Sequence, residues 1–141
     1  MRKYLKIIIP VFIIVAAVGI YYGLSEYNRK PKDNAKQDAD ITISAQDLFA
    51  AYSSDETKAN SMYLDKVIGV SGSVTSVEKD DAGLYTIHLE SGDPMSSVSC
   101  QMDERHSKDA ETVKEGDAMK IKGTCTGMLM DVVLIRCAID N

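Results

Sequence analysis

The chain has 141 residues, a formal net charge of −5 at pH 7, 45% hydrophobic residues and 6% aromatic residues. This length suffices for one ordinary domain and a short extension. Its acidic balance argues against nucleic-acid binding, which depends on neutralisation of phosphates by Lys and Arg.

The first residues predict a membrane anchor. Ile7 to Leu24 is a run of eighteen residues without a charge, long enough to cross the hydrocarbon core of a bilayer. A cleaved signal peptide is the alternative, but its apolar region usually spans about 7–15 residues and ends at a small-residue cleavage site. Ile20, Tyr21 and Tyr22 occupy that place. We therefore expect residues 1–24 to form a basic head and an uncleaved transmembrane helix.

The flanks of this segment predict its orientation. Basic residues stand in similar number on both sides, at Arg2, Lys3, Lys6, Arg29, Lys30, Lys32 and Lys36. Only six residues precede the segment, however, and more than a hundred follow it. Because long domains translocate largely regardless of charge, we expect a single-pass protein with its N-terminus inside the cytoplasm and its domain outside.

A polar stretch separates this anchor from the rest of the chain. Residues 25–40 contain few apolar side chains, so we expect a flexible tether. Residues 41–141 are then one domain, with nine Lys and Arg against seventeen Asp and Glu, a net charge of 9 − 17 = −8.

The domain begins with a helical pattern. Ser44 and Asp47 resemble a capping pair, and apolar residues then recur at helical spacing at Ala45, Leu48, Phe49 and Tyr52. A second helix is expected around Ala59, Met62 and Tyr63, which continue this spacing.

Five strands are expected after these helices. Alternating apolar residues predict three strands within residues 67–74, 85–90 and 97–102, with turns at residues 80–83 and 91–94. A short helix at residues 109–114 precedes a fourth strand from Met119 to Cys125. In the fifth strand, Val133, Ile135, Cys137 and Ile139 are expected to share one face.

This order of elements is that of the OB-fold, a five-stranded Greek-key barrel. Gly72 and Gly123 lie within predicted strands, where a small closed barrel needs sharp bends. We therefore expect a mainly β domain, an OB-fold barrel with an N-terminal helical segment, preceded by a single transmembrane helix. An open α+β meander has the same elements and stays the alternative.

Several short motifs resemble the bacterial tRNA_anti-like family of small membrane-anchored OB-fold proteins. They are Tyr27-Asn28 through Pro31, Ala45 to Leu48, Val70-Ser71-Gly72, Val98-Ser99-Cys100, Gly116-Asp117, Ile121-Lys122-Gly123, and the closing segment from Cys125 through Leu134 to Cys137. The resemblance spans nearly the whole chain. It implies the OB-fold and a place in the bacterial cell envelope, and it implies no activity. With the orientation above, we expect a single-pass protein of the bacterial inner membrane whose domain faces the periplasm.

The expected ligand face is polar. Thr86, His88, Ser97, Ser99 and Gln101 occupy the outer side of the second and third strands, where OB-folds usually bind ligands. Tyr85 is the only aromatic residue in any expected strand, so a platform for stacking bases is missing. We expect a protein or small polar ligand, and we regard nucleic acid as unlikely.

Candidate catalytic and metal-binding residues are few. His88 and His106 are the only histidines, and their spacing assembles no set of nucleophile, base and orienting group. We expect both to be solvated surface residues. Asp80-Asp81 and Asp103-Glu104 lack the spacing of a calcium loop. The chain is therefore expected to be neither an enzyme nor a cofactor-binding or metal-binding protein.

The three cysteines are expected on apolar strand faces. Buried thiols and one disulfide are both open, because an oxidising compartment favours a bridge. Strand three lies beside strand five in an OB barrel, which brings Cys100 near Cys137, while a hairpin centred on Met128 and Leu129 places Cys125 opposite Val132. We predict a Cys100–Cys137 disulfide with Cys125 free.

The last turn is unusually apolar. Residues 126–131 join the last two strands and contain Met128, Leu129 and Met130. Either these side chains form an adaptable rim beside the ligand cleft, or Leu129 or Met130 closes the open end of the barrel.

Three functional hypotheses follow. The first is a tethered binding module, the second a structural or assembly subunit of an envelope complex, and the third an envelope enzyme.

Overall fold

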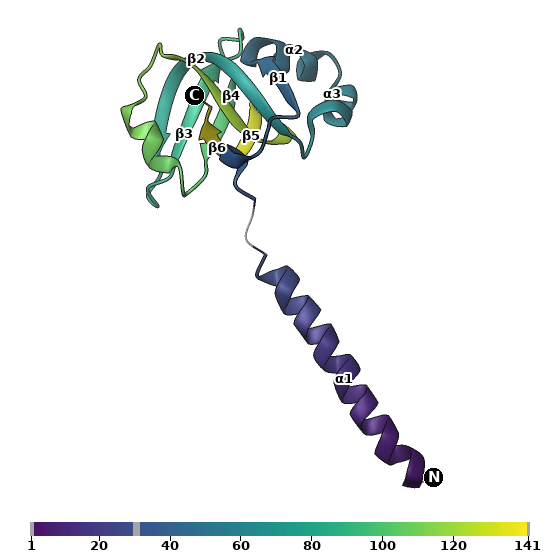
Figure 1. Ribbon diagram of the computed structural model, residues 1–141. Helices are drawn as coiled ribbons and strands as arrows, with labels where there is room; N and C mark the ends of the chain where they lie inside the picture. The colour runs from purple at the N-terminus through teal and green to yellow at the C-terminus, as the bar shows by residue number, and fades with distance from the viewer. Residues whose placement is uncertain (1, 30–31, 141) are drawn as a thin grey trace. The chain divides into compact units, whose positions relative to one another are not determined.

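The computed structural model describes residues 2–29 and 32–140, and it divides the chain into two compact units, Met1–Lys32 and Asp33–Asn141 (Figure 1). The first unit is a single helix, α1, Arg2–Tyr27. Its segment Ile7–Tyr27 is apolar and long enough to cross a membrane, with Pro10 near the start. The helix thus continues three residues past the predicted end of the anchor.

The second unit is a small barrel with short helices. Its elements are the 3-10 helix η1 (Asn34–Lys36), β1 (Ile41–Ser44), α2 (Ala45–Ser54), α3 (Glu56–Tyr63), β2 (Val67–Lys79), β3 (Tyr85–Glu90), β4 (Ser97–Met102), the 3-10 helix η2 (Ser107–Thr112), β5 (Ala118–Met128) and β6 (Val132–Ile139).

Strand pairing confirms the OB-fold. The sheet has the order β1-β2-β3-β4-β6-β5, and an additional β2–β5 pairing closes five of its strands into a barrel. β4 and β6 are parallel neighbours, and the other barrel pairs are antiparallel. The β2–β5 pairing excludes the open meander.

The helices α2 and α3 pack on the barrel through apolar side chains at the predicted spacing. Leu48 and Tyr52 of α2 are buried, as are Ala59 and Tyr63 of α3. Ser44 caps α2 as predicted, since its hydroxyl accepts a hydrogen bond of 3.1 Å from the Asp47 amide. In Figure 1 the two helices lie together at one side of the barrel.

The sequence did not predict β1. This strand has only four residues and pairs in parallel with β2, from Ile41 opposite Ile68 to Ser44 opposite Ser71. Four residues are too few for a period of two to stand out against the helical pattern that follows directly.

The structure also differs from the predicted tether over residues 25–40. Asn34 is buried, and its Nδ2 donates hydrogen bonds of 3.0 Å to Thr124 Oγ1 and 3.0 Å to the Arg136 carbonyl. Lys122 Nζ donates to the carbonyls of Ala35 and Gln37. A polar segment cannot build its own core, but these bonds fix the part from Asp33 onward to β5 and β6.

One predicted strand face needs correction. In β6 the buried residues are Val132, Leu134, Cys137 and Ala138, whereas the predicted face of Val133, Ile135, Cys137 and Ile139 is correct only at Cys137. The cause is a shift in register beside Arg136, which has a positive φ of 51°. Such a bulge inserts one residue and reverses the alternation after it.

Candidate functional site

Strands β3 and β4 bring together four of the predicted ligand-binding residues. Thr86 lies opposite Gln101, and His88 lies opposite Ser99. The residues that alternate with them, such as Ile87 and Leu89, are buried in the barrel. The four polar side chains therefore lie on its outer face, as predicted.

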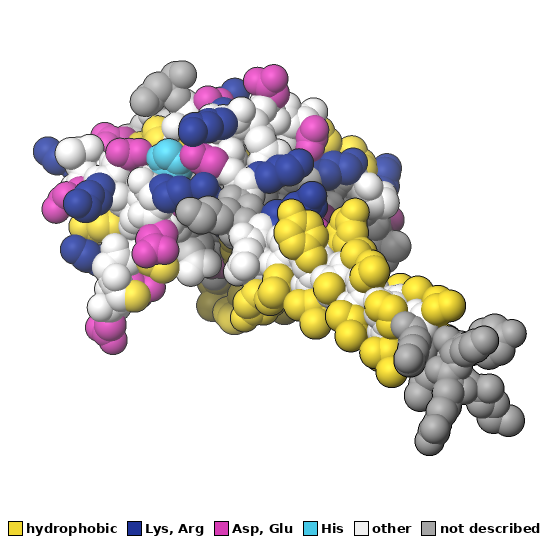
Figure 2. Space-filling view, turned by 60° about the horizontal axis from the view of Figure 1, so that its bottom comes forward, with side chains coloured by type: hydrophobic (Ala, Val, Ile, Leu, Met, Phe, Trp, Pro, Cys, Tyr) yellow, Lys and Arg dark blue, Asp and Glu magenta, His cyan; other side chains and the backbone are white. Residues whose placement is uncertain are grey.

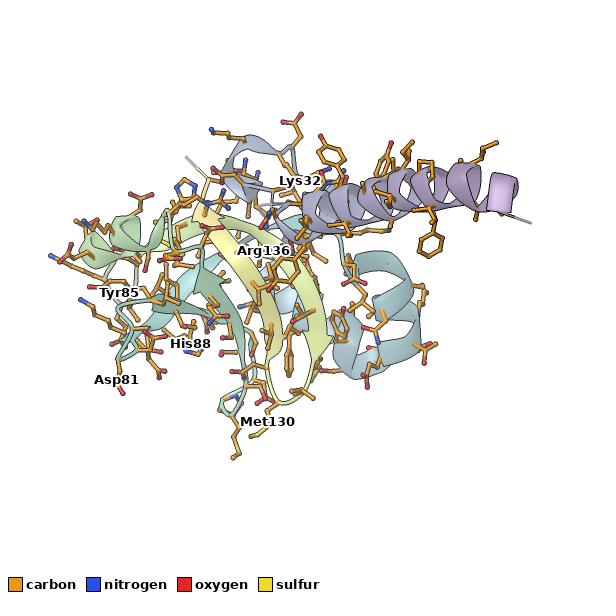
Figure 3. All side chains as sticks on the ribbon, turned by 90° about the horizontal axis from the view of Figure 1, so that it is seen from below. Lys32, Asp81, Tyr85, His88, Met130 and Arg136 are labelled. Carbon is orange, nitrogen blue, oxygen red and sulfur yellow. The ribbon has the colours of Figure 1, made fainter. Side chains whose placement is uncertain are left out.

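A cleft of about 430 Å³ has His88 in its lining. Its lining comes from the end of β2, from β3, from the loop between β3 and β4, from the start of β4, and from the turn between β5 and β6: Thr75, Ser76, Glu78, His88, Glu90, Ser91, Asp93, Pro94, Met95, Ser96, Ser97 and Asp131. Thr86, Ser99 and Gln101 are not part of it. We call this hollow the His88 cleft; Figure 3 shows His88 among the side chains of this region.

A chain of hydrogen bonds runs along the His88 cleft. Ser97 Oγ donates to Asp131 Oδ2 at 3.0 Å, and His88 Nδ1 is 3.0 Å from Ser97 Oγ. Because the serine hydroxyl has one proton and gives it to Asp131, the imidazole must donate from Nδ1. A neutral His88 then has its acceptor lone pair at Nε2.

His88 Nε2 is buried and has no hydrogen-bond partner among the residues that the structure describes. The nearest charged group is the Glu78 carboxylate, 3.8 Å away, whose side chain is 73% exposed. An exposed glutamate changes rotamer readily, so a ligand that donates a hydrogen bond could contact both Nε2 and this carboxylate.

The cleft is acidic. Its lining includes the carboxylates of Glu78, Glu90, Asp93 and Asp131, and it includes no Lys or Arg. On the domain face in view in Figure 2, Lys and Arg side chains are interspersed with Asp and Glu. The cleft therefore favours positively charged or hydrogen-bond-donating ligands over phosphates.

Asp131 also fixes the shape of the cleft. Its Oδ1 accepts a hydrogen bond of 2.8 Å from the Ser97 amide, which joins the β5–β6 turn to the start of β4. Within the β3–β4 loop, Ser91 Oγ donates to the Ser96 carbonyl at 2.6 Å. Asp131 was not among the predicted site residues, and the only signal for it in the sequence is its place directly after the apolar residues of the turn.

The apolar turn is exposed. Leu129 and Met130 are 92% and 75% exposed, so neither closes the end of the barrel. Figure 3 shows Met130 at the tip of the hairpin. Met128, the last residue of β5, is half-buried and packs against the core.

A second hollow, of about 370 Å³, lies between α3 and the β5–β6 hairpin. Its lining residues are Glu56, Asn60, Leu64, Thr126, Gly127, Met128, Leu129 and Val133. We call it the α3 groove. Of the predicted site residues, His88 is in the His88 cleft, and Met128 and Leu129 are in the α3 groove. Thr86, Ser99, Gln101 and Met130 line neither of these two hollows.

The three cysteines are buried free thiols in the structure. Cys100 and Cys137 lie on the neighbouring strands β4 and β6. Burial raises the pKa of Cys137 well above its ordinary value, and the Cys100 thiol contributes to the raised pKa. The predicted pair therefore lies together, although no bridge joins it. Cys125 is opposite Leu134 rather than the predicted Val132, and its sulfur is 3.3 Å from the Tyr52 hydroxyl.

The expectation of two solvated histidines is wrong. The side chains of His88 and His106 are only 17% and 24% exposed. His106 Nε2 is 2.9 Å from Asp33 Oδ1, so this ring helps to hold the segment that precedes β1. Burial acts to raise the pKa of Asp33, but the hydrogen bonds from His106 and Ala35 lower it overall.

Comparison with known proteins supports the fold. The model of the tRNA_anti-like family matches residues 1–139. No curated protein matches the chain. The crystal structure of a putative nucleic acid-binding lipoprotein from Klebsiella pneumoniae is 18% identical, with a TM-score of 0.58, and the match covers 79% of this chain and 100% of that one. A putative aspartyl-tRNA synthetase from Leishmania major is 11% identical with a TM-score of 0.46, over 86% of this chain and 26% of that one.

Proposed function

The chain belongs to the tRNA_anti-like family, and from that premise we propose that it is a membrane-tethered module that binds a small polar, positively charged ligand in the His88 cleft. The observation that carries this proposal is the hydrogen-bonded chain of Asp131, Ser97 and His88, which leaves Nε2 free as an acceptor beside Glu78. The cleft lies where OB-folds usually bind ligands.

The order of the three side chains argues for binding rather than catalysis. In a serine hydrolase the histidine lies between the serine and the carboxylate, so that it can take the hydroxyl proton. Here Ser97 lies between His88 and Asp131, and its hydroxyl donates to the carboxylate while it accepts from the imidazole. This arrangement fixes the ring but activates no nucleophile.

Nucleic acid is not the ligand that we propose. The Klebsiella pneumoniae protein is described as nucleic acid-binding, but at 18% identity the likeness supports the fold alone. Tyr85 is the only aromatic residue in the barrel strands β2 to β6, and the Lys79 ammonium lies 5.1 Å from the centre of its ring. One covered ring cannot stack successive bases, and four carboxylates in the cleft repel phosphates.

We further propose that α1 anchors the protein in the bacterial inner membrane and that the domain lies in the periplasm. The support is the apolar length of Ile7–Tyr27 and the long domain that follows it, because long domains translocate largely regardless of charge. This location would expose the His88 cleft to ligands outside the cytoplasm.

Ligand-induced thermal shifts of the full chain in phosphatidylcholine nanodiscs test the proposed cleft. The probes are putrescine, choline and arginine as cations, glucose as a neutral compound, and AMP and an oligonucleotide as anions. We expect at least one cation to raise the melting temperature of the wild type. His88→Gln and Glu78→Gln should weaken its binding about tenfold, which corresponds to about 1.4 kcal/mol.

Met130→Ser is the control, because Met130 is 75% exposed and does not line the cleft. It should bind the same cation as the wild type does. Stabilisation by the anions alone, or cation binding that survives both cleft substitutions, would contradict the proposal.

The second candidate function is that of an assembly subunit of an envelope complex. The observation that favours it is the pair of exposed apolar side chains, Leu129 and Met130, because isolated soluble domains seldom place neighbouring large apolar residues on a loop tip.

A further inference from the structure

The α3 groove is lined so that it could hold one apolar side chain of a partner. Its buried base is Gly127, where φ is +102°. A Cβ atom at this glycine would lie 3.5 Å from Asn60 Oδ1 and 3.7 Å from Leu64 Cδ1, so both side chains stand directly over the backbone. Leu129 and Val133 complete the lining from the hairpin.

Three exposed apolar residues lie at this groove. Leu64 and Leu129 line it, and Met130 follows Leu129. The other large hydrophobic residues that are exposed in the described part of the domain, Met62 and Met95, are not part of its lining. Methionine and leucine at such a site suit a protein contact, because their flexible side chains adapt to the shape of a partner.

One hydrogen-bond acceptor in the groove has no partner. Asn60 Oδ1 is buried and makes no hydrogen bond to any residue that the structure describes. Buried polar atoms are normally paired, so an unpaired amide oxygen beside an apolar hollow favours a partner that supplies a donor together with an apolar side chain.

The charge of the domain restricts the partner. Residues 41–141 have a net charge of −8, Glu56 lies in the lining, and no Lys or Arg is part of it. A second copy of this chain would be repelled, and so would an anionic lipid surface. A protein segment with positive charge would be attracted instead.

We propose that the α3 groove binds a second protein through a leucine-like side chain flanked by Lys or Arg. This interface is separate from the His88 cleft, since the two linings share no residue. It would give the protein a role in assembly in addition to ligand binding.

Peptide binding to the full chain in phosphatidylcholine nanodiscs tests the proposal. The probe is a short fluorescein-labelled peptide with two leucines between pairs of lysines. Two comparison peptides replace the leucines by serines or the lysines by glutamates, and empty nanodiscs give the background. We expect only the lysine–leucine peptide to bind above this background, with weaker binding at higher salt.

Two variants locate the binding. Leu129→Ser removes an apolar side chain that is 92% exposed, so the melting temperature should not change while peptide affinity falls at least tenfold. Met62→Ser is the matched control, because Met62 is an exposed apolar residue that lines neither the α3 groove nor the His88 cleft. Its affinity should equal that of the wild type.

Each other result overturns the proposal. If the glutamate peptide bound as tightly as the lysine–leucine peptide, the partner would not need positive charge. If the two variants had equal affinity for the lysine–leucine peptide, the α3 groove would not be its binding site. Leu129-dependent dimerisation in sedimentation experiments would make a second copy the occupant. Loss of peptide binding in His88→Gln, with Leu129→Ser unaffected, would place the peptide in the His88 cleft. That outcome would leave the small-ligand proposal to be judged by its own thermal shifts.

Discussion

At the scale of single residues, Asp131 has structural roles that its position in the sequence does not reveal. It ends the apolar turn, its Oδ1 accepts from the Ser97 amide, and its Oδ2 accepts from the Ser97 hydroxyl that orients His88. The same carboxylate therefore shapes the His88 cleft and fixes the tautomer of its histidine. A polar group with two such bonds has a larger effect on a site than its exposure indicates.

Asp103 and Arg105 form the strongest ion pair of the domain by geometry, with distances of 2.6 Å from Nη2 to Oδ2 and 2.8 Å from Nε to Oδ1. The Arg105 hydrogen bonds lower the pKa of Asp103 to about 2. In the unfolded chain an aspartate has a pKa of about 3.9. The Asp103 carboxylate therefore binds a proton less readily in the folded state than in the unfolded chain. The ion pair stabilises the protein at pH values above about 4.

We predict that the free energy of unfolding decreases as the pH falls from about 4 to about 2. The loss from this pair is at most about 2 kcal/mol, because Arg105 is partly exposed and solvent screens its charge. Denaturant unfolding of the full chain across this range measures it. Asp103→Asn and Arg105→Gln should both flatten this part of the curve, and a wild-type slope in either variant would contradict the assignment.

At the scale of elements, the segment before β1 is held by long-range hydrogen bonds rather than by its own composition. Asn34 contacts Thr124 and Arg136, which are 90 and 102 positions away. Its removal would leave the buried Thr124 hydroxyl and a backbone carbonyl without this donor. A buried group without a partner costs about 1–3 kcal/mol.

We predict that Asn34→Ala lowers the free energy of unfolding by that amount and makes residues 33–40 exchange amide hydrogens faster. Hydrogen exchange of the full chain, followed by mass spectrometry, measures the second effect. Asp38→Ala is the control, because Asp38 is exposed in the same segment. Equal exchange in both variants would mean that Asn34 does not fix the segment.

The elements also show what the sequence could and could not predict. Alternation and spacing identified the five barrel strands and both helices, because these patterns are local. The four-residue β1, the bulge at Arg136 and the ordering of Asn34 depend on partners far along the chain. The candidate site divides in the same way. Alternation placed His88 on the outer face, but Asp93 joins it through the β3–β4 loop, Asp131 joins it through the β5–β6 turn, and Glu78 joins it from β2, which extends past the predicted end of that strand.

At the scale of the whole molecule, the chain combines an apolar helix with a strongly acidic domain. A domain with a net charge of −8 has little attraction for anionic lipid headgroups or for nucleic acid. Attachment to a membrane would then depend on α1 alone, while recognition would depend on the His88 cleft and the α3 groove. Each of these three parts can be altered by substitutions that leave the other two intact.

The final prediction concerns membrane topology. We expect Ile7 to Leu24 to stay in the mature protein and the domain to lie outside the cytoplasm, because the apolar run exceeds a signal-peptide core and long domains translocate largely regardless of charge. Protease added to intact spheroplasts should digest the domain, while a cytoplasmic marker in the same cells stays protected until lysis. The intact mass of the purified protein should include the N-terminal residues. A domain that is digested only after lysis would reverse the orientation, and a mature chain that begins after Leu24 would show that the segment is a cleaved signal peptide.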